Sequence, residues 1–264
     1  MAISFSPCRV SRSSEMSERH FLVVGGSKGS GLALVEHLLA AGQRVSVLAR
    51  SASPLPSSTL LNWQQLDVTD GGALRAALDA CARSQGKIDS AVFMQRNRAT
   101  GDAFDTDLAV ALTATRNAID HLLAQGHFSL DESGNSIVMV SSIADHYVAP
   151  EQDLGYHVSK AGLVQLARYY ALQLGAHGIR VNVVSPCVVI KEAARDYYRQ
   201  NSWITDRFER FIPLRRAGSS RDIINAILFL TGEQSSYITG QNIVVDGGLS
   251  LRSHESIIRD FPRQ

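Results

Sequence analysis

The stretch "HFLVVGGSKGSGLA", residues 20–33, joins an apolar run to a glycine-rich turn. After it, "LALVEHLLAAGQ" repeats apolar residues with helical periodicity up to Gly42, so the segment predicts a strand, a turn and a helix. Glycines at 25, 29 and 31 let the backbone turn sharply and approach a phosphate, towards which helix N-terminal amides point. A plain tight connection has the same composition, so the turn alone does not establish a ligand site.

The same alternation continues along the chain. Apolar runs typical of buried strands lie at 44–50, 88–94, 135–142, 179–186 and 241–248, and another strand precedes "LDVTD" at 66–70. Helical periodicity lies between them, at 71–84, 107–126, 155–178 and 220–232. Buried strands separated by helices predict an α/β fold with a mostly parallel sheet covered on both faces. Because the 264 residues contain no internal repeat and no linker, we expect a single domain.

Composition argues against nucleic-acid and membrane partners. Lysine plus arginine number 26 and aspartate plus glutamate 25, so no strong field attracts nucleic acid or an anionic surface. No apolar run approaches the ~18 residues of a membrane span. Cys8, Cys81 and Cys187 have neither metal-ligand spacing nor the even number of a disulfide framework. We therefore expect a cytoplasmic protein without a metal site.

The N-terminal segment differs from the rest of the chain. "MAISFSPCRVSRSSEMSERH" is rich in serine and arginine and has no acidic residue before Glu15, a composition shared by organelle transit peptides. An alternative start at Met16 or a disordered extension is favoured over a transit peptide. We assign residues 1–17 to a flexible N-terminal extension and residues 18–264 to the folded domain.

A tyrosine and a lysine share one helix face in "GYHVSKAGLVQLARYYALQL", residues 155–174. Tyr156 and Lys160 are four positions apart, so both side chains can point into the same cleft. A free phenol has a pKa near ~10, and a neighbouring ammonium stabilises the phenolate. The pair therefore predicts an acid-base function, although the solvated start of an ordinary helix has the same spacing.

Taken together, these motifs resemble the short-chain dehydrogenase/reductase family. The resemblance lies in the glycine spacing G-x-x-x-G-x-G, in Tyr156-x-x-x-Lys160, in Ser142 fourteen positions before the tyrosine, and in the segments 179–189 and 212–248. It covers about residues 19–248. It implies a Rossmann-like, doubly wound fold of about seven parallel strands, a nicotinamide dinucleotide, and a homotetramer or homodimer.

The resemblance also implies roles for individual residues. Ser142 would hydrogen-bond the reacting oxygen, in preference to Ser141, Tyr156 would exchange a proton with it, and Lys160 would also hold the nicotinamide ribose. The residues implied to bind the cofactor are Gly25, Ser27, Lys28, Gly29, Ser30, Gly31, Arg50, Asp67, Val68, Tyr156, Lys160, Pro186 and Val189.

The end of the second strand bears on cofactor choice. Relatives that prefer NAD(H) carry an acid there, whereas this chain has Ala49 and then Arg50. Arg50 can hold a 2'-phosphate, and Lys28 would add a second cation to the same site. We expect NADP(H) to be preferred over NAD(H), with two solvated surface cations as the plainer interpretation.

Several positions depart from the family pattern. The usual "NNAG" after the fourth strand is "FMQR", residues 93–96, which puts the packing beside the adenosine in doubt. Asp107 lies where a catalytic asparagine is usual, and we include it in the catalytic set because a carboxylate can replace the amide as an acceptor. A simple ion pair with Lys160 would explain the aspartate too. Cys187 and Lys191 replace a glycine and a threonine near the nicotinamide, and a space-filling role is favoured for the thiol.

The longest irregular connection, residues 191–217, is a candidate substrate lid because it follows a strand's carboxyl end. It carries Tyr197, Tyr198, Trp203 and Phe208 among basic residues. With Arg96 and Arg98 leaving the fourth strand, these cations suggest an anionic substrate, although a lid with a solvated face explains them too. The tail after Gly248 packs either at a subunit interface or over the cleft.

The sequence therefore predicts an NADP(H)-dependent oxidoreductase that transfers hydride between the nicotinamide and a ketone or secondary-alcohol carbon, with Tyr156 as acid and base. A non-catalytic dinucleotide-binding regulator or scaffold of the same fold is the main alternative, because of "FMQR" and Asp107. A sugar-nucleotide epimerase or dehydratase is less favoured, because those enzymes have a larger C-terminal substrate region.

Overall fold

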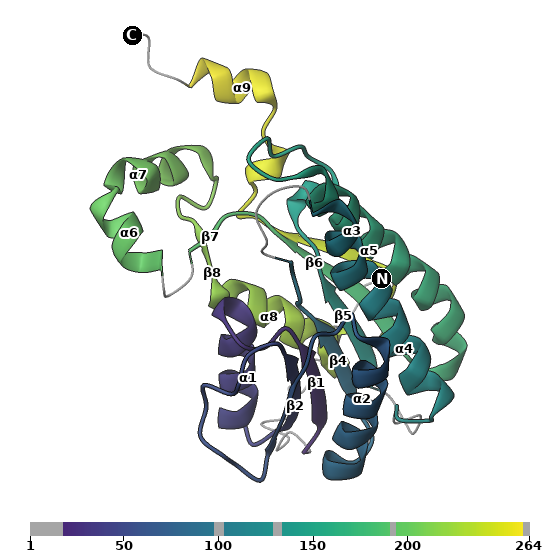
Figure 1. The fold of residues 1–264 in the computed structure, drawn as a ribbon. Coiled ribbons are helices and arrows are strands. Elements are labelled where there is room, and N and C mark those ends of the chain that lie inside the picture. The colour runs from purple at the N-terminus through teal and green to yellow at the C-terminus, as the bar shows by residue number, and fades with distance from the viewer. Residues whose placement is uncertain (1–17, 98–102, 129–133, 191–193, 261–264) are drawn as a thin grey trace, which may run out of the picture.

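A seven-stranded parallel sheet forms the centre of the computed structural model in Figure 1. The structure describes residues 18–97, 103–128, 134–190 and 194–260, so the proposed extension at 1–17, Arg98 and Lys191 lie outside the described residues. In sheet order the strands are β3 (Leu61–Gln65), β2 (Arg44–Ala49), β1 (His20–Val24), β4 (Ser90–Phe93), β5 (Ser136–Val140), β6 (Arg180–Pro186) and β9 (Asn242–Val245). The predicted α/β, doubly wound fold is confirmed.

Helices cover both faces of this sheet, as Figure 1 shows. On one face pack α1 (Gly29–Ala40) and α8 (Ser220–Thr231), and on the other α2 (Gly71–Gln85), α4 (Ala114–Ala124) and α5 (Leu154–Leu174). Each layer has its own apolar core, and the strand side chains alternate between the two. No helix among the described residues combines the length and hydrophobicity that crossing a membrane would require.

The order of the strands creates a cleft at one point of the sheet. From β1 the chain passes through α1 to β2 on one side, and later through α2 to β4 on the other side of β1. Because the two crossovers diverge, their helices leave a crevice beyond the carboxyl ends of β1 and β4, where ligands bind in open α/β sheets.

Two predicted segments have a different form from the one expected. The helix predicted at 107–126 is composed of α3 (Phe104–Leu108), a π-helical turn at Ala109–Thr113 and α4. The connection at 191–217, expected to be irregular, contains α6 (Arg195–Gln200) and α7 (Ser202–Phe211), with the short strands β7 (Val189–Ile190) and β8 (Gly218–Ser219) paired at its base. Its helices are only 6 and 10 residues long and largely exposed, and helices this short have little stability of their own, so they were not expected.

Shorter elements complete the described chain. They are the 3-10 turns Ile143–Asp145, Gly175–His177, Glu233–Ser235 and Leu249–Leu251, and α9 (His254–Arg259). The tail places α9 near the lid, where the Arg210 guanidinium donates to the Asp260 carbonyl. Tyr147, after β5, donates to the Ser250 carbonyl at 3.3 Å. The described tail thus contacts segments at the carboxyl edge of the sheet.

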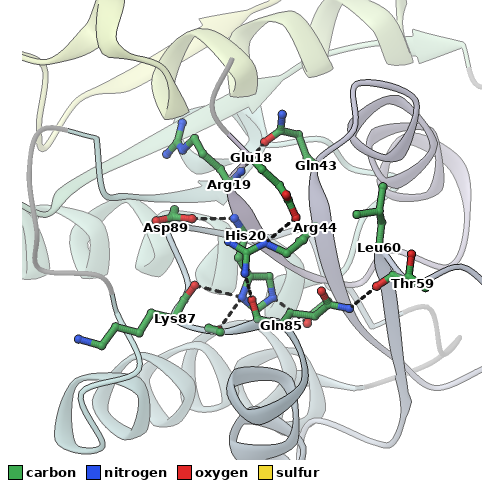
Figure 2. Close-up of polar contacts among 12 residues, drawn as sticks. Glu18, Arg19, His20, Gln43, Arg44, Thr59, Leu60, Gln85, Lys87 and Asp89 are labelled. Carbon is green, nitrogen blue, oxygen red and sulfur yellow. Dashed lines mark hydrogen bonds and ion pairs between the residues drawn. The ribbon is translucent and has the colours of Figure 1, made fainter. Parts of the chain in front are cut away.

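The buried His20 links β1 to β2 and to the chain before β4 by hydrogen bonds at the opposite, amino edge of the sheet (Figure 2). Nδ1 of His20 lies 2.9 Å from the Gly86 carbonyl, which only a ring N–H can satisfy, so Nε2 accepts from the Ser46 hydroxyl at 2.8 Å. The His20 amide donates to Asp89 Oδ2 at 2.6 Å. Burial is the largest cause that lowers the pKa of His20 below its ordinary value. The neutral imidazole is therefore part of the folded structure.

This neutral histidine predicts acid sensitivity. Because the folded state disfavours protonation of His20, the unfolded chain binds more protons than the folded chain once the pH falls below 6.5. The stability that the neutral imidazole contributes above that pH is therefore lost as the pH falls. The variant His20→Gln should be less stable at pH 7.5 by about 1–3 kcal/mol, because a buried hydrogen bond is lost. Urea unfolding between pH 7.5 and 5.0 should show a shallower pH dependence for His20→Gln than for wild type. The exposed control His177→Gln should retain the wild-type slope, and an equal slope in all three proteins would contradict the assignment.

Candidate active site

Two adjoining hollows lie at the carboxyl ends of β1, β2, β4, β5 and β6. The β2-side hollow has a volume of about 280 Å³, and the α5-side hollow has a volume of about 440 Å³. Both hollows are lined by Gly25, Lys28, Met94 and Arg96. The two hollows therefore adjoin across the turn after β1, at the place predicted by the order of the strands.

The β2-side hollow brings together residues that the sequence assigned to the adenosine half of the cofactor. Its lining includes Gly25, Ser27, Lys28, Arg50, Asp67 and Val68. The Asp67 carboxylate accepts from the Thr69 amide at 2.9 Å and the Thr69 hydroxyl at 2.7 Å. These hydrogen bonds, the backbone one first, and the charge of Arg50 lower the pKa of Asp67. The exposed side chains of Lys28 and Arg50 therefore line this hollow together with the Asp67 carboxylate, which its hydrogen bonds hold in place.

Two glycines of the turn are required by close backbone contacts. A Cβ on Gly25, whose φ is +90°, would lie 2.6 Å from the Gln95 amide nitrogen. A Cβ on Gly31 would lie 2.4 Å from the Gly25 carbonyl oxygen. The Gly25 contact is with the main chain of Met94 and Gln95, so the segment after β4 passes directly beside the turn after β1.

The residues present fit a dinucleotide. Lys28 is the N-cap of α1, and its side chain makes no capping hydrogen bond, so the first amides of this helix point towards the hollows without a side-chain acceptor. Gln95 is buried, and its Oε1 has no hydrogen-bond partner among the described residues. An uncapped helix N-terminus and an unsatisfied buried acceptor in one cleft are features that a polar, phosphate-bearing ligand would satisfy.

The α5-side hollow contains the predicted catalytic side chains. Ser142, Tyr156 and Lys160 line it, together with Ser30, Gly31, Pro186 and Val189. From the lid, Tyr198 on α6 joins the lining, whereas Tyr197 and Trp203 are more than half exposed. Cys187 also lines this hollow, and burial raises the pKa of its thiol. Gly29 and Asp107 lie outside both linings.

The two neighbouring serines have different environments. The Ser141 hydroxyl is buried and donates to the Lys160 carbonyl at 2.8 Å, so it fixes α5 against the end of β5. The Ser142 hydroxyl accepts from the Ala144 amide at 3.2 Å and remains at the wall of the hollow. Of the two, Ser142 has the hydroxyl group that can also donate to a ligand.

Lys160 is a buried amine with an unusual titration. Its side chain is 5% exposed, and Nζ donates to the Val140 carbonyl at 3.0 Å. Burial is the largest cause that lowers the pKa of Lys160, the charge of Arg96 adds to it, and Asp107 and Asp145 oppose both; together they bring the pKa to about 8. At neutral pH the amine is therefore still mostly protonated, but it titrates much closer to neutrality than an ordinary lysine.

The charge of Asp107 raises the pKa of Lys160, although Asp107 does not line the cleft. It is buried in α3, at the point where α5 begins. A Cβ on Gly155 would lie 2.7 Å from the Phe104 backbone and 2.8 Å from Asp107 Oδ2, so the glycine permits the two helices to touch. The carboxylate thus acts on Lys160 by its charge and lies outside the cavity wall.

Arg96 makes a contact that the sequence did not predict. Its guanidinium Cζ lies 4.7 Å from the centroid of the Tyr156 ring, and Lys160 Nζ lies 5.7 Å from the same centroid. One Arg96 nitrogen donates to Gln152 Oε1 at 3.1 Å. Two cations therefore flank one phenol. The departure "FMQR" indicated a cation near the cleft, but only the tertiary structure places it on the tyrosine.

Comparisons with known proteins agree with this geometry. The family profile described as enoyl-(acyl carrier protein) reductase matches residues 26–250. D-erythrulose reductase of Gallus gallus is 32% identical over 241 residues, which cover 87% of this chain and 95% of that protein.

Solved structures give the same result. A short-chain dehydrogenase/reductase family oxidoreductase from Burkholderia thailandensis is 30% identical with a TM-score of 0.75, over 92% of this chain and 97% of that one. An NADPH-bound short-chain oxidoreductase from Pseudomonas aeruginosa, which contains an atypical catalytic centre, is 29% identical with a TM-score of 0.75, over 89% and 98% of the two chains. The chain belongs to the short-chain dehydrogenase/reductase family, a family of nicotinamide-dinucleotide-dependent oxidoreductases.

Proposed function

We propose that this protein is an NADP(H)-dependent oxidoreductase that interconverts a ketone and a secondary alcohol, with Tyr156 as the acid and base. The observation that carries the proposal is the convergence of Ser142, Tyr156 and Lys160 on one hollow that adjoins the glycine turn. A nicotinamide dinucleotide, when bound, supplies the exchangeable hydride. A regulator or scaffold that only bound a dinucleotide would have no use for all three side chains.

The protein's own residues handle the proton and the substrate oxygen. Ser142 donates a hydrogen bond to that oxygen, and Tyr156 gives it a proton during reduction or takes one during oxidation. The ammonium of Lys160 and the guanidinium of Arg96 lie beside the Tyr156 ring, so two cations adjoin the group that exchanges the proton. Asp107 helps to keep Lys160 charged, which supports its place in the catalytic set as a positioning residue.

The preference for NADP(H) rests on Lys28 and Arg50. Both side chains are exposed and line the β2-side hollow, where two cations can bind a 2'-phosphate. The NADPH-bound relative from Pseudomonas aeruginosa is consistent with this preference. The other cofactor residues assigned from sequence, Gly29 included, keep their proposed roles around the turn.

An anionic substrate, such as one with a carboxylate, is the class that this site favours. Arg96 lines the α5-side hollow beside the phenol, so its charge lies next to the place where the substrate oxygen must sit. The lid, residues 191–217, would close over such a substrate with Tyr198. Guanidinium groups bind carboxylates with paired hydrogen bonds, which would orient the substrate as well as attract it.

We further propose a cytoplasmic homotetramer or homodimer. The outer surface of α5 exposes apolar side chains that a monomer would leave in water, namely Leu154, Val158, Tyr169 and Leu172. Cys81 and Cys187 are free thiols, as a reducing compartment favours.

The principal test is Tyr156→Phe. Purified enzyme is screened with NADPH against ketones supplied as matched neutral and carboxylate-bearing pairs, and the decrease in reduced-nicotinamide absorbance gives the rate. Wild type should reduce the acids with the lower KM, and Tyr156→Phe should lower kcat by about 10²–10⁴-fold because proton transfer is lost. The Kd for NADPH should change by less than about threefold, since the phenol hydroxyl is one contact among many. Full turnover by the variant would refute the proposed mechanism.

Cofactor preference has its own variant. Arg50→Ala should weaken NADPH binding by roughly 10–100-fold, because a charge-assisted hydrogen bond of about 1.5–3 kcal/mol is removed. The Kd for NADH should stay within about twofold of wild type, as fluorescence titration would measure. Arg83→Ala, an exposed arginine in the last turn of α2, serves as the control. Equal losses for both coenzymes would argue against a 2'-phosphate at Arg50.

The charges around Lys160 predict opposite shifts in pH dependence. Arg96 lowers the pKa of Lys160 and Asp107 raises it, so Arg96→Met should raise that pKa above its value of about 8 and Asp107→Asn should lower it. Each shift should be roughly 0.5–1 unit. The decline of kcat with rising pH should move with it, to higher pH in Arg96→Met and to lower pH in Asp107→Asn.

The titration of ¹³C-labelled lysine by NMR measures the same pKa without turnover. Arg207→Met, which removes a cation that stacks on Trp203, is the matched control for loss of an arginine. Shifts of the same sign in Arg96→Met and Asp107→Asn would show that other interactions dominate the titration.

A further inference from the structure

A three-residue cluster of possible metal ligands lies away from the cleft. Asp79 on α2, His121 in the last turn of α4 and His127 just after that helix meet at one point. Nε2 of His121 lies 2.7 Å from Asp79 Oδ1, and Nε2 of His127 lies 2.8 Å from the same oxygen. The three atoms all lie within 4.8 Å of one another. Two imidazole nitrogens and one carboxylate oxygen therefore meet at a common position.

The backbone around these ligands is well held. The His127 amide donates to the Leu122 carbonyl at 2.9 Å, and its carbonyl accepts from the Ile88 amide at 2.8 Å, directly before β4. His121 accepts from the Gln125 amide at 3.0 Å within the same helix end. Asp79 lies in the middle of α2, next to buried Leu78. Ligands on two packed helices and an anchored turn are positioned by the core and do not depend on a loose loop.

Solvent reaches the three side chains of the cluster only in part. The side chains of His121, His127 and Asp79 are 11%, 21% and 33% exposed. In Figure 1, α2 and α4 lie side by side on the same face of the sheet, and the two helices pack together in the structure. The cluster is therefore at the margin of the core between these helices, where an ion can enter and still be largely enclosed.

We propose that Asp79, His121 and His127 bind a divalent transition-metal ion of the zinc class. Neutral imidazole nitrogens and one carboxylate oxygen are the donors that Zn²⁺ and Co²⁺ accept, whereas Ca²⁺ and Mg²⁺ prefer oxygen alone. In tetrahedral coordination with bonds of about 2.0–2.1 Å, ligand atoms stand roughly 3.3 Å apart. The present hydrogen-bonded spacing would have to open by about half an ångström, which side-chain rotation can supply.

Binding replaces two hydrogen bonds by coordinate bonds. Beside the carboxylate acceptor, both Nε2 atoms carry hydrogens that they donate to Asp79 Oδ1. On binding, the Nε2 proton of each imidazole is released to water and Nδ1 takes one up, so the ring stays neutral and its Nε2 lone pair faces the ion, while water completes the coordination. No metal was expected from the cysteine spacing, and no local pattern brings Asp79 to the two histidines, which lie 42 and 48 residues further along the chain.

The site has a structural role. His127 bonds to the chain just before the amino end of β4, so the ion lies towards the sheet edge opposite the cleft and links α2 to α4. An ion bound only by the folded state stabilises it by mass action. We therefore expect Zn²⁺ to raise the melting temperature without changing kcat, whichever substrate the enzyme reduces.

Isothermal titration of tag-free, chelator-treated full-length protein with Zn²⁺ is the direct test. Wild type should bind one equivalent per chain, and His127→Gln or Asp79→Asn should weaken this binding at least tenfold while retaining the circular dichroism of the fold. At a hundredfold excess over Kd, Zn²⁺ should raise the wild-type Tm by about 5 °C or more, and should do so less in either variant. Bound Co²⁺ should give the visible bands of a tetrahedral ion with nitrogen and oxygen ligands.

The control His177→Gln, which removes an exposed histidine after α5, should bind as wild type does. Absence of wild-type binding, equal affinity in wild type and the Asp79 and His127 variants, or a thiolate charge-transfer band with Co²⁺ would each overturn the proposal. If the Asp79 or His127 variant unfolds, loss of Zn²⁺ binding in His121→Gln and the Co²⁺ spectrum of wild type still test the site. NADPH affinity should be unchanged in these variants, so failure of this site is separable from failure of the proposed function.

Discussion

The whole active-site region depends on a close backbone approach at the carboxyl end of β1. Gly25 passes beside the exit of β4, and the first turn of α1 packs on it through Gly31, at distances that leave no room for a Cβ. Any side chain at these positions would separate β1 from β4 or α1 from the sheet. This contact brings the helix N-terminus, Lys28 and the residues after β4 to the same cleft. Elsewhere in the sheet, ordinary side-chain packing between strands and helices is sufficient.

The electrostatics of the cleft follow from how little water reaches Lys160. In a region of low dielectric, the charges of Arg96, Asp107 and Asp145 act on the amine strongly, although its own hydrogen bond goes to the Val140 carbonyl. The guanidinium on the Tyr156 ring occupies the place that the family usually leaves to small residues. A cation at this position stacks on the proposed acid and base and also lines the α5-side hollow, so this one residue bears on both the tyrosine and the proposed substrate.

Periodicity was sufficient to predict the sheet and the helices on both faces, because each depends on local sequence that repeats. Tyr156 and Lys160 were also predictable from their fixed offset on one helix face. The other residues of the two hollows were expected from the resemblance to the family, and two of the assigned residues, Gly29 and Asp107, lie outside both linings. The lid helices were not predicted, because α6 and α7 are short and bury little. The Arg96 contact and the Asp79, His121 and His127 cluster were also not predictable, since each requires segments far apart in the chain to meet. No local pattern encodes such a meeting.

The two edges of the sheet satisfy their polar groups differently. At the amino edge, Arg180 donates to the carbonyls of Leu230 and Gly232 at the end of α8, and Arg19 donates to that of Thr231. These cations complete a helix C-terminus, where positive charge is favourable. At the carboxyl edge, Gln95 has a buried oxygen without a partner among the described residues, and the start of α1 lacks a side-chain cap. Unsatisfied groups reduce stability unless a partner pairs with them, and at the carboxyl edge a ligand in the cleft can supply that partner for the start of α1.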